Sequence, residues 1–306
     1  MSKVIKKAAV FVTLLATLAT FSTLLYGQAK IRLDETSNYG PAIVHHYSED
    51  ADVLIVAWTG TDDHINVMQS RDGIDWYAKV RLDETSDHPP ALTSDGRYIY
   101  LAWTGRGNGK LNTMRSRDGI DWRTKIRLDE ESGLEPGLAY INERIYMIWR
   151  GKGNHKINIL SSEDGIDWEN KVRLEETTSN RPAIAGHNGR IYIAWTGKGN
   201  DKLNIMRSRD GVDWRAKVRL DDTSKDGPAL CSYDGRLFIA WVGSGNNKLN
   251  VMRSDEGIDW RAKIRLDEET EKSPTLYSDE VYIYLGWIGT RDKKLNISRS
   301  RDGIDF

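Results

Sequence analysis

Short apolar runs separated by turn residues fill the chain from residue 30 to its last residue. Between Pro182 and Asp222, four such runs follow one another. The second run, Arg190 to Trp195, is apolar on both faces, which is typical of a strand covered on both sides. The third, Lys202 to Ser208, alternates between apolar and polar positions. The fourth, Lys217 to Asp222, is apolar on one face and charged on the other. The pattern predicts four β-strands with the fourth outermost, where charges discourage edge pairing.

This unit recurs every 46 residues, as the step from Trp168 to Trp214 illustrates. All 11 tryptophans lie on the repeat. Five close a turn after the third run: Trp76, Trp122, Trp168, Trp214 and Trp260. Six end the second run: Trp58, Trp103, Trp149, Trp195, Trp241 and Trp287. We interpret the first set as staples of their turn and the second as packing between neighbouring units. A period of this size, with four strands and no helical periodicity, predicts a β-propeller.

The number of strands predicts how the ring closes. The first strand of a unit occurs six times, and starts at Pro41, Pro90, Pro136, Pro182, Pro228 and Pro274. Only five of these units are followed by a fourth strand. Lys30 to Glu35 has the fourth-strand pattern without a unit before it, so we expect it to pair with Lys294 to Ser300. The prediction is an all-β, six-bladed propeller over residues 30–306, with blades of 46 residues and four strands, whose last blade is completed by strand 30–35.

The first 29 residues have a different pattern. Lys3, Lys6 and Lys7 precede an uncharged run from Ala8 to Gly27. This is typical of a secretory signal peptide, with Gly27-Gln28-Ala29 as its cleavage site. The alternative is an uncleaved membrane anchor, since an apolar run of about 20 residues can span a bilayer. Both interpretations predict a secreted or extracytoplasmic propeller.

Composition excludes several classes of function. The formal net charge is −1, so no basic field attracts nucleic acid. The single cysteine, Cys231, excludes a disulfide framework and a thiolate metal cluster. The 6 histidines lie at positions that differ between units. No phosphate-binding loop, dinucleotide fingerprint, zinc motif or EF-hand loop occurs, so we predict neither a metal nor a cofactor.

The turn after each third strand carries a motif, S-R-D-G-I-D-W in its commonest form. Its serine and aspartate suit hydrogen bonds to the turn backbone, and its glycine suits a positive φ. The motif resembles the Asp-box (BNR) repeat of sialidase-like propellers, S-x-D-x-G-x-x-W, but is one residue shorter. In the fifth copy, Glu256 replaces the aspartate. The resemblance implies a structural turn away from the ligand face, made by Ser70, Asp72, Trp76, Ser116, Asp118, Trp122, Ser162, Asp164, Trp168, Ser208, Asp210, Trp214, Ser254, Trp260, Ser300, Asp302 and Phe306.

The same resemblance implies what an active site would need. Sialidases use three arginines, a Tyr–Glu pair and an acid/base aspartate, each from a different blade. The blades of this chain are close copies of one another. The F/Y-R-I-P motif of sialidases is absent, and the corresponding stretch reads N-Y-G-P-A-I from Asn38. Arg150 and Arg181 depart from the repeat, but two arginines do not make a triad. We therefore predict no catalytic residue, and a sialidase-type glycoside hydrolase remains the less favoured alternative.

Near-identical blades instead suit a multivalent binder, since repetition of a weak site raises avidity. The loops between second and third strands, and between blades, lie on the ligand face of propellers. They supply amides and carboxylates that match sugar hydroxyls: Asn108, Asn154, Asn200, Asn246, Glu35, Glu84, Glu130, Glu176 and Glu268, with Asp222 at the fifth copy. We predict a carbohydrate-binding, lectin-like module whose partners are glycans. The alternative is a protein-interaction or structural propeller with an extracellular protein partner, in which the repeated Asn66, Asn112, Asn158, Asn204, Asn250 and Asn296 only stabilise the fold.

Overall fold

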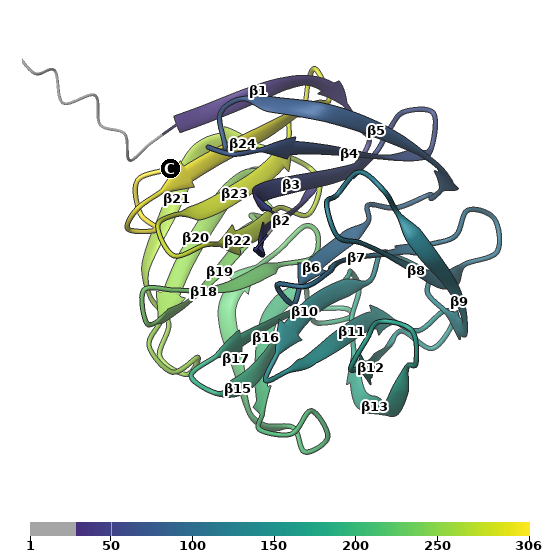
Figure 1. The fold of residues 1–306 in the computed structure, drawn as a ribbon. Coiled ribbons are helices and arrows are strands. Elements are labelled where there is room, and N and C mark those ends of the chain that lie inside the picture. The colour runs from purple at the N-terminus through teal and green to yellow at the C-terminus, as the bar shows by residue number, and fades with distance from the viewer. Residues whose placement is uncertain (1–28, 50) are drawn as a thin grey trace, which may run out of the picture.

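The computed structural model describes residues 29–49 and 51–306. Within them, 24 strands form six four-stranded antiparallel sheets, arranged as blades around a central axis (Figure 1). The described residues form no helix. The predicted six-bladed propeller is therefore confirmed. The predicted signal peptide or anchor lies outside the described residues, apart from Ala29.

Each blade runs from the axis outward. The innermost strands are β2 (Ala42–Tyr47), β6 (Ala91–Ser94), β10 (Gly137–Ile141), β14 (Ala183–His187), β18 (Ala229–Tyr233) and β22 (Thr275–Ser278). The second strands are β3 (Asp52–Thr59), β7 (Ile99–Thr104), β11 (Arg144–Arg150), β15 (Arg190–Thr196), β19 (Arg236–Val242) and β23 (Ile283–Ile288). The third strands are β4 (His64–Ser70), β8 (Lys110–Ser116), β12 (Lys156–Ser162), β16 (Lys202–Ser208), β20 (Lys248–Ser254) and β24 (Lys294–Ser300). The outermost strands are β5 (Trp76–Thr85), β9 (Arg123–Glu131), β13 (Glu169–Thr177), β17 (Arg215–Thr223), β21 (Arg261–Glu269) and β1 (Ala29–Thr36). Blades 1 to 6 are numbered by their innermost strands in chain order.

The two ends of the described chain share blade 6. Strand β1 pairs antiparallel with β24, with Ile31 opposite Ile297. Figure 1 shows the purple first strand alongside the yellow last one. Strand β1 is one residue longer at each end than the predicted 30–35. The predicted closure of the ring is confirmed.

The core lies between blades as well as within them. Trp103 of blade 2 is fully buried and clusters with Val44, Ile55 and Val67 of blade 1. All six second-strand tryptophans are at most 1% exposed. A large ring buried at each seam stabilises the contact between neighbouring sheets. The predicted packing of this set is confirmed.

The outermost strands begin earlier than their pattern predicts. Strand β17 starts at Arg215, two residues before Lys217. Its pairing with β16 shifts register between Ile205 and Arg207, and Ala216 has a φ of 52°. A bulge of this kind inserts a residue and breaks the alternation of apolar and polar positions. The sequence pattern therefore missed the first two residues of the strand.

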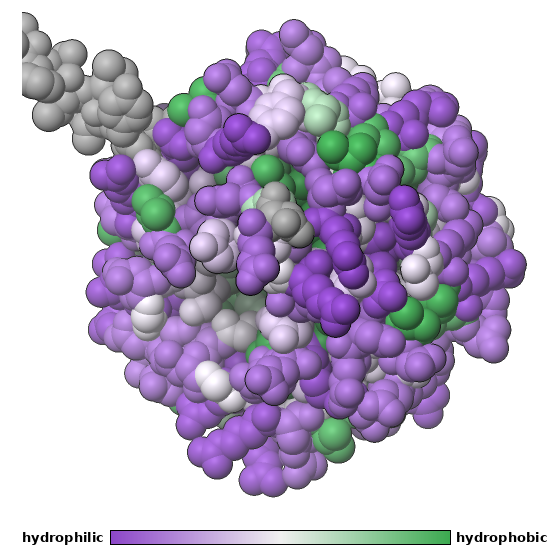
Figure 2. All heavy atoms as spheres, viewed as in Figure 1, coloured by the Kyte–Doolittle hydropathy of each residue, from purple (hydrophilic) through white to green (hydrophobic). Residues whose placement is uncertain are grey.

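The face of the molecule in Figure 2 is mainly hydrophilic and is hollowed at its centre.

Candidate ligand-binding site

An ion pair bridges each of the six seams between neighbouring blades, and we call the surface around each bridge a cleft. In cleft 4 the Nζ of Lys217, from β17, lies 2.5 Å from Glu176 of β13 in the preceding blade. The same ammonium lies 5.4 Å from the centre of the Trp195 ring. The lysine thus contacts a buried aromatic ring while pairing across the seam, an arrangement that favours a fixed cation. We number each cleft after the blade that supplies the lysine.

The same trio of acid, tryptophan and lysine recurs in every cleft. It consists of Glu35, Trp58 and Lys79 in cleft 1, Glu84, Trp103 and Lys125 in cleft 2, Glu130, Trp149 and Lys171 in cleft 3, Glu176, Trp195 and Lys217 in cleft 4, Asp222, Trp241 and Lys263 in cleft 5, and Glu268, Trp287 and Lys30 in cleft 6. All five candidate glutamates are therefore paired with a lysine of the next blade and are partly buried.

The candidate asparagines lie in the turns between second and third strands, and all four are exposed. In cleft 4 the Oδ1 of Asn200 accepts a hydrogen bond from the backbone N–H of Lys202 at 3.0 Å. Asn108, Asn154 and Asn246 accept the matching bond at 2.8, 2.9 and 3.0 Å. Gly197 lies beneath this amide, and a Cβ there would lie 2.7 Å from Asn200 Oδ1. Gly197 is therefore required because a larger side chain would clash with Asn200, and not because of its φ.

Cleft 4 brings the two predicted loop positions together. Glu176 and Asn200 both line a cavity of about 330 Å³, together with Trp195, Lys217 and Arg219. Glu176 belongs to blade 3 and the other four to blade 4, so the cavity exists only because two blades meet. An amide, a carboxylate, two cations and an aromatic edge provide the donors and acceptors that a polar ligand requires.

Sequence reasoning missed the lysine and the arginine of this cavity. They are the alternating charges of the fourth strand, K-x-R-L, which we interpreted only as protection of a sheet edge. The available signal was their presence in all six copies, at Lys30 and Arg32, Lys79 and Arg81, Lys125 and Arg127, Lys171 and Arg173, Lys217 and Arg219, and Lys263 and Arg265.

The S-x-D-G turns lie at the opposite end of the third strand from the asparagine turns. In blade 4 the Oδ1 of Asp210 accepts hydrogen bonds from the backbone N–H groups of Val212 and Asp213, each at 2.9 Å. These bonds lower the pKa of Asp210 to about 2. Gly211 has a φ of 79°, and its carbonyl accepts a bond from the Trp214 indole at 3.0 Å. The carboxylate is used within its own turn, which suits a structural role.

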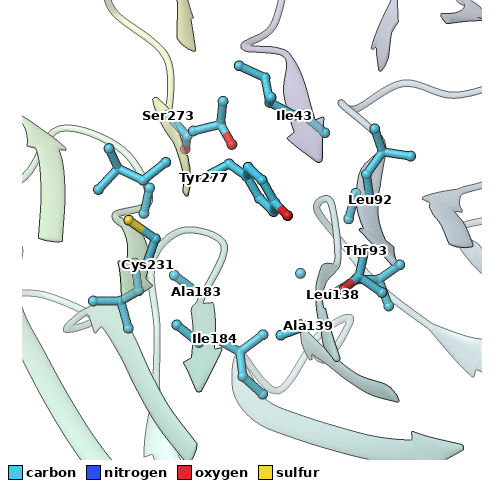
Figure 3. Close-up of a pocket in the computed structure, with 18 of the residues that line it drawn as sticks. Ile43, Leu92, Thr93, Leu138, Ala139, Ala183, Ile184, Cys231, Ser273 and Tyr277 are labelled. Carbon is cyan, nitrogen blue, oxygen red and sulfur yellow. The ribbon is translucent and has the colours of Figure 1, made fainter. Parts of the chain in front are cut away.

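The repeat breaks down at one end of the central channel. The channel has a volume of about 270 Å³ and is lined mainly by aliphatic side chains, with Tyr277 projecting into it (Figure 3). At its mouth, Nε of Arg181 lies 3.3 Å from Oε1 of Glu135. The Nη2 of Arg181 donates to the carbonyl of Pro274, two blades away, at 2.5 Å. Arg181 therefore lies across the mouth of the channel.

Glu135 is the most perturbed acid at this mouth. Its burial raises the pKa of the carboxyl to about 7, against the opposing pull of Arg181. Asp226 raises it further. Burial lowers the pKa of Arg150, and the negative charge of Glu135 opposes that shift. The Nη1 of Arg150 donates to the Ser179 carbonyl at 2.7 Å. Of the two arginines that depart from the repeat, Arg181 thus pairs with Glu135, and both donate to backbone carbonyls.

The described residues hold neither a cluster of metal ligands nor a membrane-spanning helix. They contain no group of three or more His, Cys, Asp or Glu side chains placed to hold a metal ion. Residues 29–49 and 51–306 contain no helix that is long and apolar enough to span a membrane.

The solved structures that are similar to this fold include the following three. The Hadza microbial sialidase Hz136 aligns over 87% of this chain and 66% of its own, with a TM-score of 0.65 and 18% identity. AofleA from Arthrobotrys oligospora aligns over 91% and 88%, with a TM-score of 0.69 and 12% identity. A mutant of Aleuria aurantia lectin in complex with α-methyl-L-fucoside aligns over 87% and 92%, with a TM-score of 0.67 and 12% identity. The chain thus spans just under two thirds of that sialidase.

Comparison by sequence gives no assignment. No family model matches the chain, and no curated protein matches it. At these low identities, the structural likeness establishes a sialidase-like six-bladed propeller fold. The fold is shared by proteins described as sialidases and as a lectin, so it does not by itself assign a function.

Proposed function

We propose that this protein is a multivalent carbohydrate-binding propeller that acts outside the cytoplasm and binds glycans in the clefts between its blades. The observation that carries this proposal is the cavity of cleft 4. There Glu176, Asn200, Lys217 and Arg219 surround a space of about 330 Å³ beside Trp195. Sugars present a ring of hydroxyls that both donate and accept, so a cavity lined by clustered polar donors and acceptors matches them.

Repetition is the second support. The acid, tryptophan and lysine of the cleft recur six times around the ring. Each cleft is small and open, and we expect it to bind a sugar weakly. Several weak sites on one rigid ring bind a surface carrying many glycans far more tightly than one site does. The similarity of the fold to a lectin that binds a fucoside agrees with this mode of binding.

The two alternatives place function elsewhere. A hydrolase would use the non-repeated groups at the channel mouth, but Arg181 lies across that mouth and both arginines bond to backbone carbonyls. A protein-interaction or structural propeller would have no use for the cavities, and their repeated side chains would only join the blades. The ion pairs across each seam are compatible with that alternative, so an experiment must separate it from glycan binding.

The test is a glycan array probed with residues 29–306 at high protein density. We expect binding that is lost when the six equivalent arginines of the clefts are all replaced by alanine: Arg32, Arg81, Arg127, Arg173, Arg219 and Arg265. The control replaces Arg123 and Arg215 by alanine, because these exposed arginines begin β9 and β17 beside the S-x-D-G turns, where they pair with Asp121 and Asp213. Absence of binding to every glycan would contradict the proposal and favour the interaction propeller. Equal loss in the control would show that general charge, rather than the clefts, retains glycans.

We also propose that the chain is exported, by cleavage after Ala29. The support is the pattern of its first 29 residues, three lysines before an uncharged run. Mass spectrometry of the protein recovered outside the cytoplasm should give an N-terminus at Lys30. A chain that starts at Met1 and sediments with membranes would indicate the anchor instead.

A further inference from the structure

We infer that clefts 2 to 5 bind the carboxylate of an acidic sugar, whereas clefts 1 and 6 are already occupied by the protein's own aspartates. This inference rests on the proposed function and divides the six clefts into two kinds. It follows from one position in the turn between the second and third strands. That position is aspartate in blades 1 and 6, at Asp62 and Asp292, and asparagine in the other four.

In blades 1 and 6 the aspartate holds the arginine of the outermost strand. Asp62 accepts from Nε of Arg81 at 3.0 Å, and Nη2 of the same arginine lies 2.9 Å from it. In the neighbouring blade 6, Asp292 lies 2.6 Å from Nη2 of Arg32. Each pair uses Oδ2 of the aspartate. The other oxygen, Oδ1, accepts the backbone N–H two residues further on, at 3.3 Å for Asp62 and 3.0 Å for Asp292.

In blades 2 to 5 the backbone bond is unchanged and the arginine loses its partner. Asn200 Oδ1 accepts from Lys202 just as Asp292 Oδ1 accepts from Lys294. Because this bond fixes which side-chain atom is the oxygen, the amide N–H₂ occupies the position of the aspartate Oδ2. An amide nitrogen is a donor, and the guanidinium beside it has donors only. Two sets of donors, the amide of Asn200 and the guanidinium of Arg219, therefore line cleft 4, and the three equivalent clefts carry the same two residue types.

The arginines concerned are Arg127, Arg173, Arg219 and Arg265, and all four are exposed. Within the described part of the chain, none of their side chains forms a hydrogen bond or ion pair, in contrast to the side chains of Arg32 and Arg81. The pKa of exposed Glu175 is lowered mainly by its bond to Lys156, with a lesser electrostatic pull from Arg173. Arg173 thus acts on this carboxylate only at a distance.

Clefts 1 and 6 show which chemical group the arginine of clefts 2 to 5 would bind. The protein itself places a carboxylate on this arginine in two of six copies. A guanidinium matches a carboxylate in shape and charge, and such bonds are stronger than neutral ones. The lysine of each cleft is already paired with the acid of the preceding blade, so the arginine is the cation left for a ligand. A uronic acid or another sugar acid supplies both the carboxylate and the hydroxyls that the rest of the cleft can meet.

The experiment compares a sugar acid with its neutral ester. Methyl α-D-galacturonoside and its methyl ester are titrated separately into ¹⁵N-labelled residues 29–306, and the indole N–H signals of the second-strand tryptophans are followed. We expect the acid to shift the signals of Trp103, Trp149, Trp195 and Trp241, and not those of Trp58 and Trp287. The ester should bind on the order of tenfold more weakly, because a charge-assisted pair is lost.

Two variants exchange the two kinds of cleft with little change in shape. Asp62→Asn together with Asp292→Asn should release Arg81 and Arg32, so that all six indole signals respond to the acid. Asn108→Asp, Asn154→Asp, Asn200→Asp and Asn246→Asp together should close the remaining clefts and abolish the response. Unchanged melting temperatures would show that both variants remain folded.

The outcomes separate this inference from the function on which it rests. Equal binding of acid and ester, or six responding clefts in the unmodified protein, would overturn the inference and leave glycan binding intact. A response to the acid that persists in the fourfold asparagine-to-aspartate variant would also overturn it. If no glycan on the array binds and neither probe shifts any signal, the proposed function itself fails.

Discussion

Ile31, in the first strand of the described chain, lies directly opposite Ile297 in the last one. This pairing makes blade 6 from both ends of the chain and closes the ring. Strand β1 occupies the place that β5, β9, β13, β17 and β21 occupy in the other blades. Leu33 of β1 and Leu82 of β5 are equivalent residues in the K-x-R-L pattern, at 7% and 9% exposed. They allow the strength of the closure to be compared with that of a strand held by its own blade.

We expect Leu33→Ala and Leu82→Ala to lower the free energy of unfolding by similar amounts, about 2–5 kcal/mol. Each change removes a buried side chain beneath an outermost strand and leaves a cavity. Urea denaturation of the two variants measures the comparison. A negligible effect of Leu33→Ala beside a large effect of Leu82→Ala would mean that β1 detaches from the ring without cost. Such a result would contradict a tightly closed propeller.

The S-x-D-G turns offer a second internal comparison. The Oγ of Ser208 accepts the backbone N–H of Gly211 at 2.9 Å and donates to Asp210. Ser254 is the equivalent residue of blade 5, and its Oγ is buried without a hydrogen-bond partner in the described structure. Glu256 follows it where the other turns have aspartate. Its longer side chain pairs instead with Arg190 and Arg207 of blade 4.

Ser208→Ala should therefore destabilise the protein by about 1–2 kcal/mol, since it leaves a buried N–H unsatisfied. Ser254→Ala should change stability by less than about 0.5 kcal/mol, because the hydroxyl it removes makes no bond. Thermal melts of the two variants, recorded side by side, give the answer. Equal costs would mean that the serine contributes through packing alone.

Much of this fold is predictable because each blade repeats one local pattern. The second strand, ending at Trp195, is apolar on both faces, which predicts a strand covered on both sides. The fourth strand, from Lys217, alternates apolar and charged residues, which predicts one exposed face. Asn188 and Gly189 form the hairpin turn between the first and second strands of blade 4, and both have the positive φ that an Asn-Gly turn needs. Closure followed from counting strands, because a sheet edge left unpaired is unfavourable.

The site was less accessible from sequence. The approach of Lys217 to Glu176 joins residues of two blades, and their distance depends on how the blades rotate about the axis. No local pattern carries that information. Arg219 has the same neighbours in sequence as Arg81, yet Arg81 is paired and Arg219 is not. The difference lies in one atom of a turn residue some 19 positions away, Asn200 in place of Asp62, and only the structure brings the two together.

The channel mouth yields a prediction about catalysis. Purified residues 29–306 should release no fluorophore from a sialic-acid reporter above the background rate, with an authentic sialidase as the positive control. The physical reason is that Arg181 lies across the mouth and Arg150 is bonded to the Ser179 carbonyl, which leaves neither arginine at this mouth free for a substrate. Turnover that disappears in Arg150→Ala would reverse this expectation and identify the mouth as an active site.

The same mouth should make stability depend on pH. Burial raises the pKa of Glu135 to about 7 from its ordinary value of 4.5. Between these values the folded protein keeps a proton that the unfolded chain releases. The favourable contribution is therefore complete below about pH 4.5 and is lost as the pH rises through 7.

Glu135→Gln keeps the shape of the side chain and stays neutral at every pH. We expect its melting temperature to exceed that of the unmodified protein by a few degrees at pH 8, and the difference to shrink towards pH 5. Scanning calorimetry across this range measures the effect, with exposed Glu280→Gln as the control that should follow the unmodified protein throughout. Parallel curves for Glu135→Gln and the unmodified protein would show that Glu135 is ionised over the whole range. In that case Arg181, at 3.3 Å, would outweigh the cost of burying the charge.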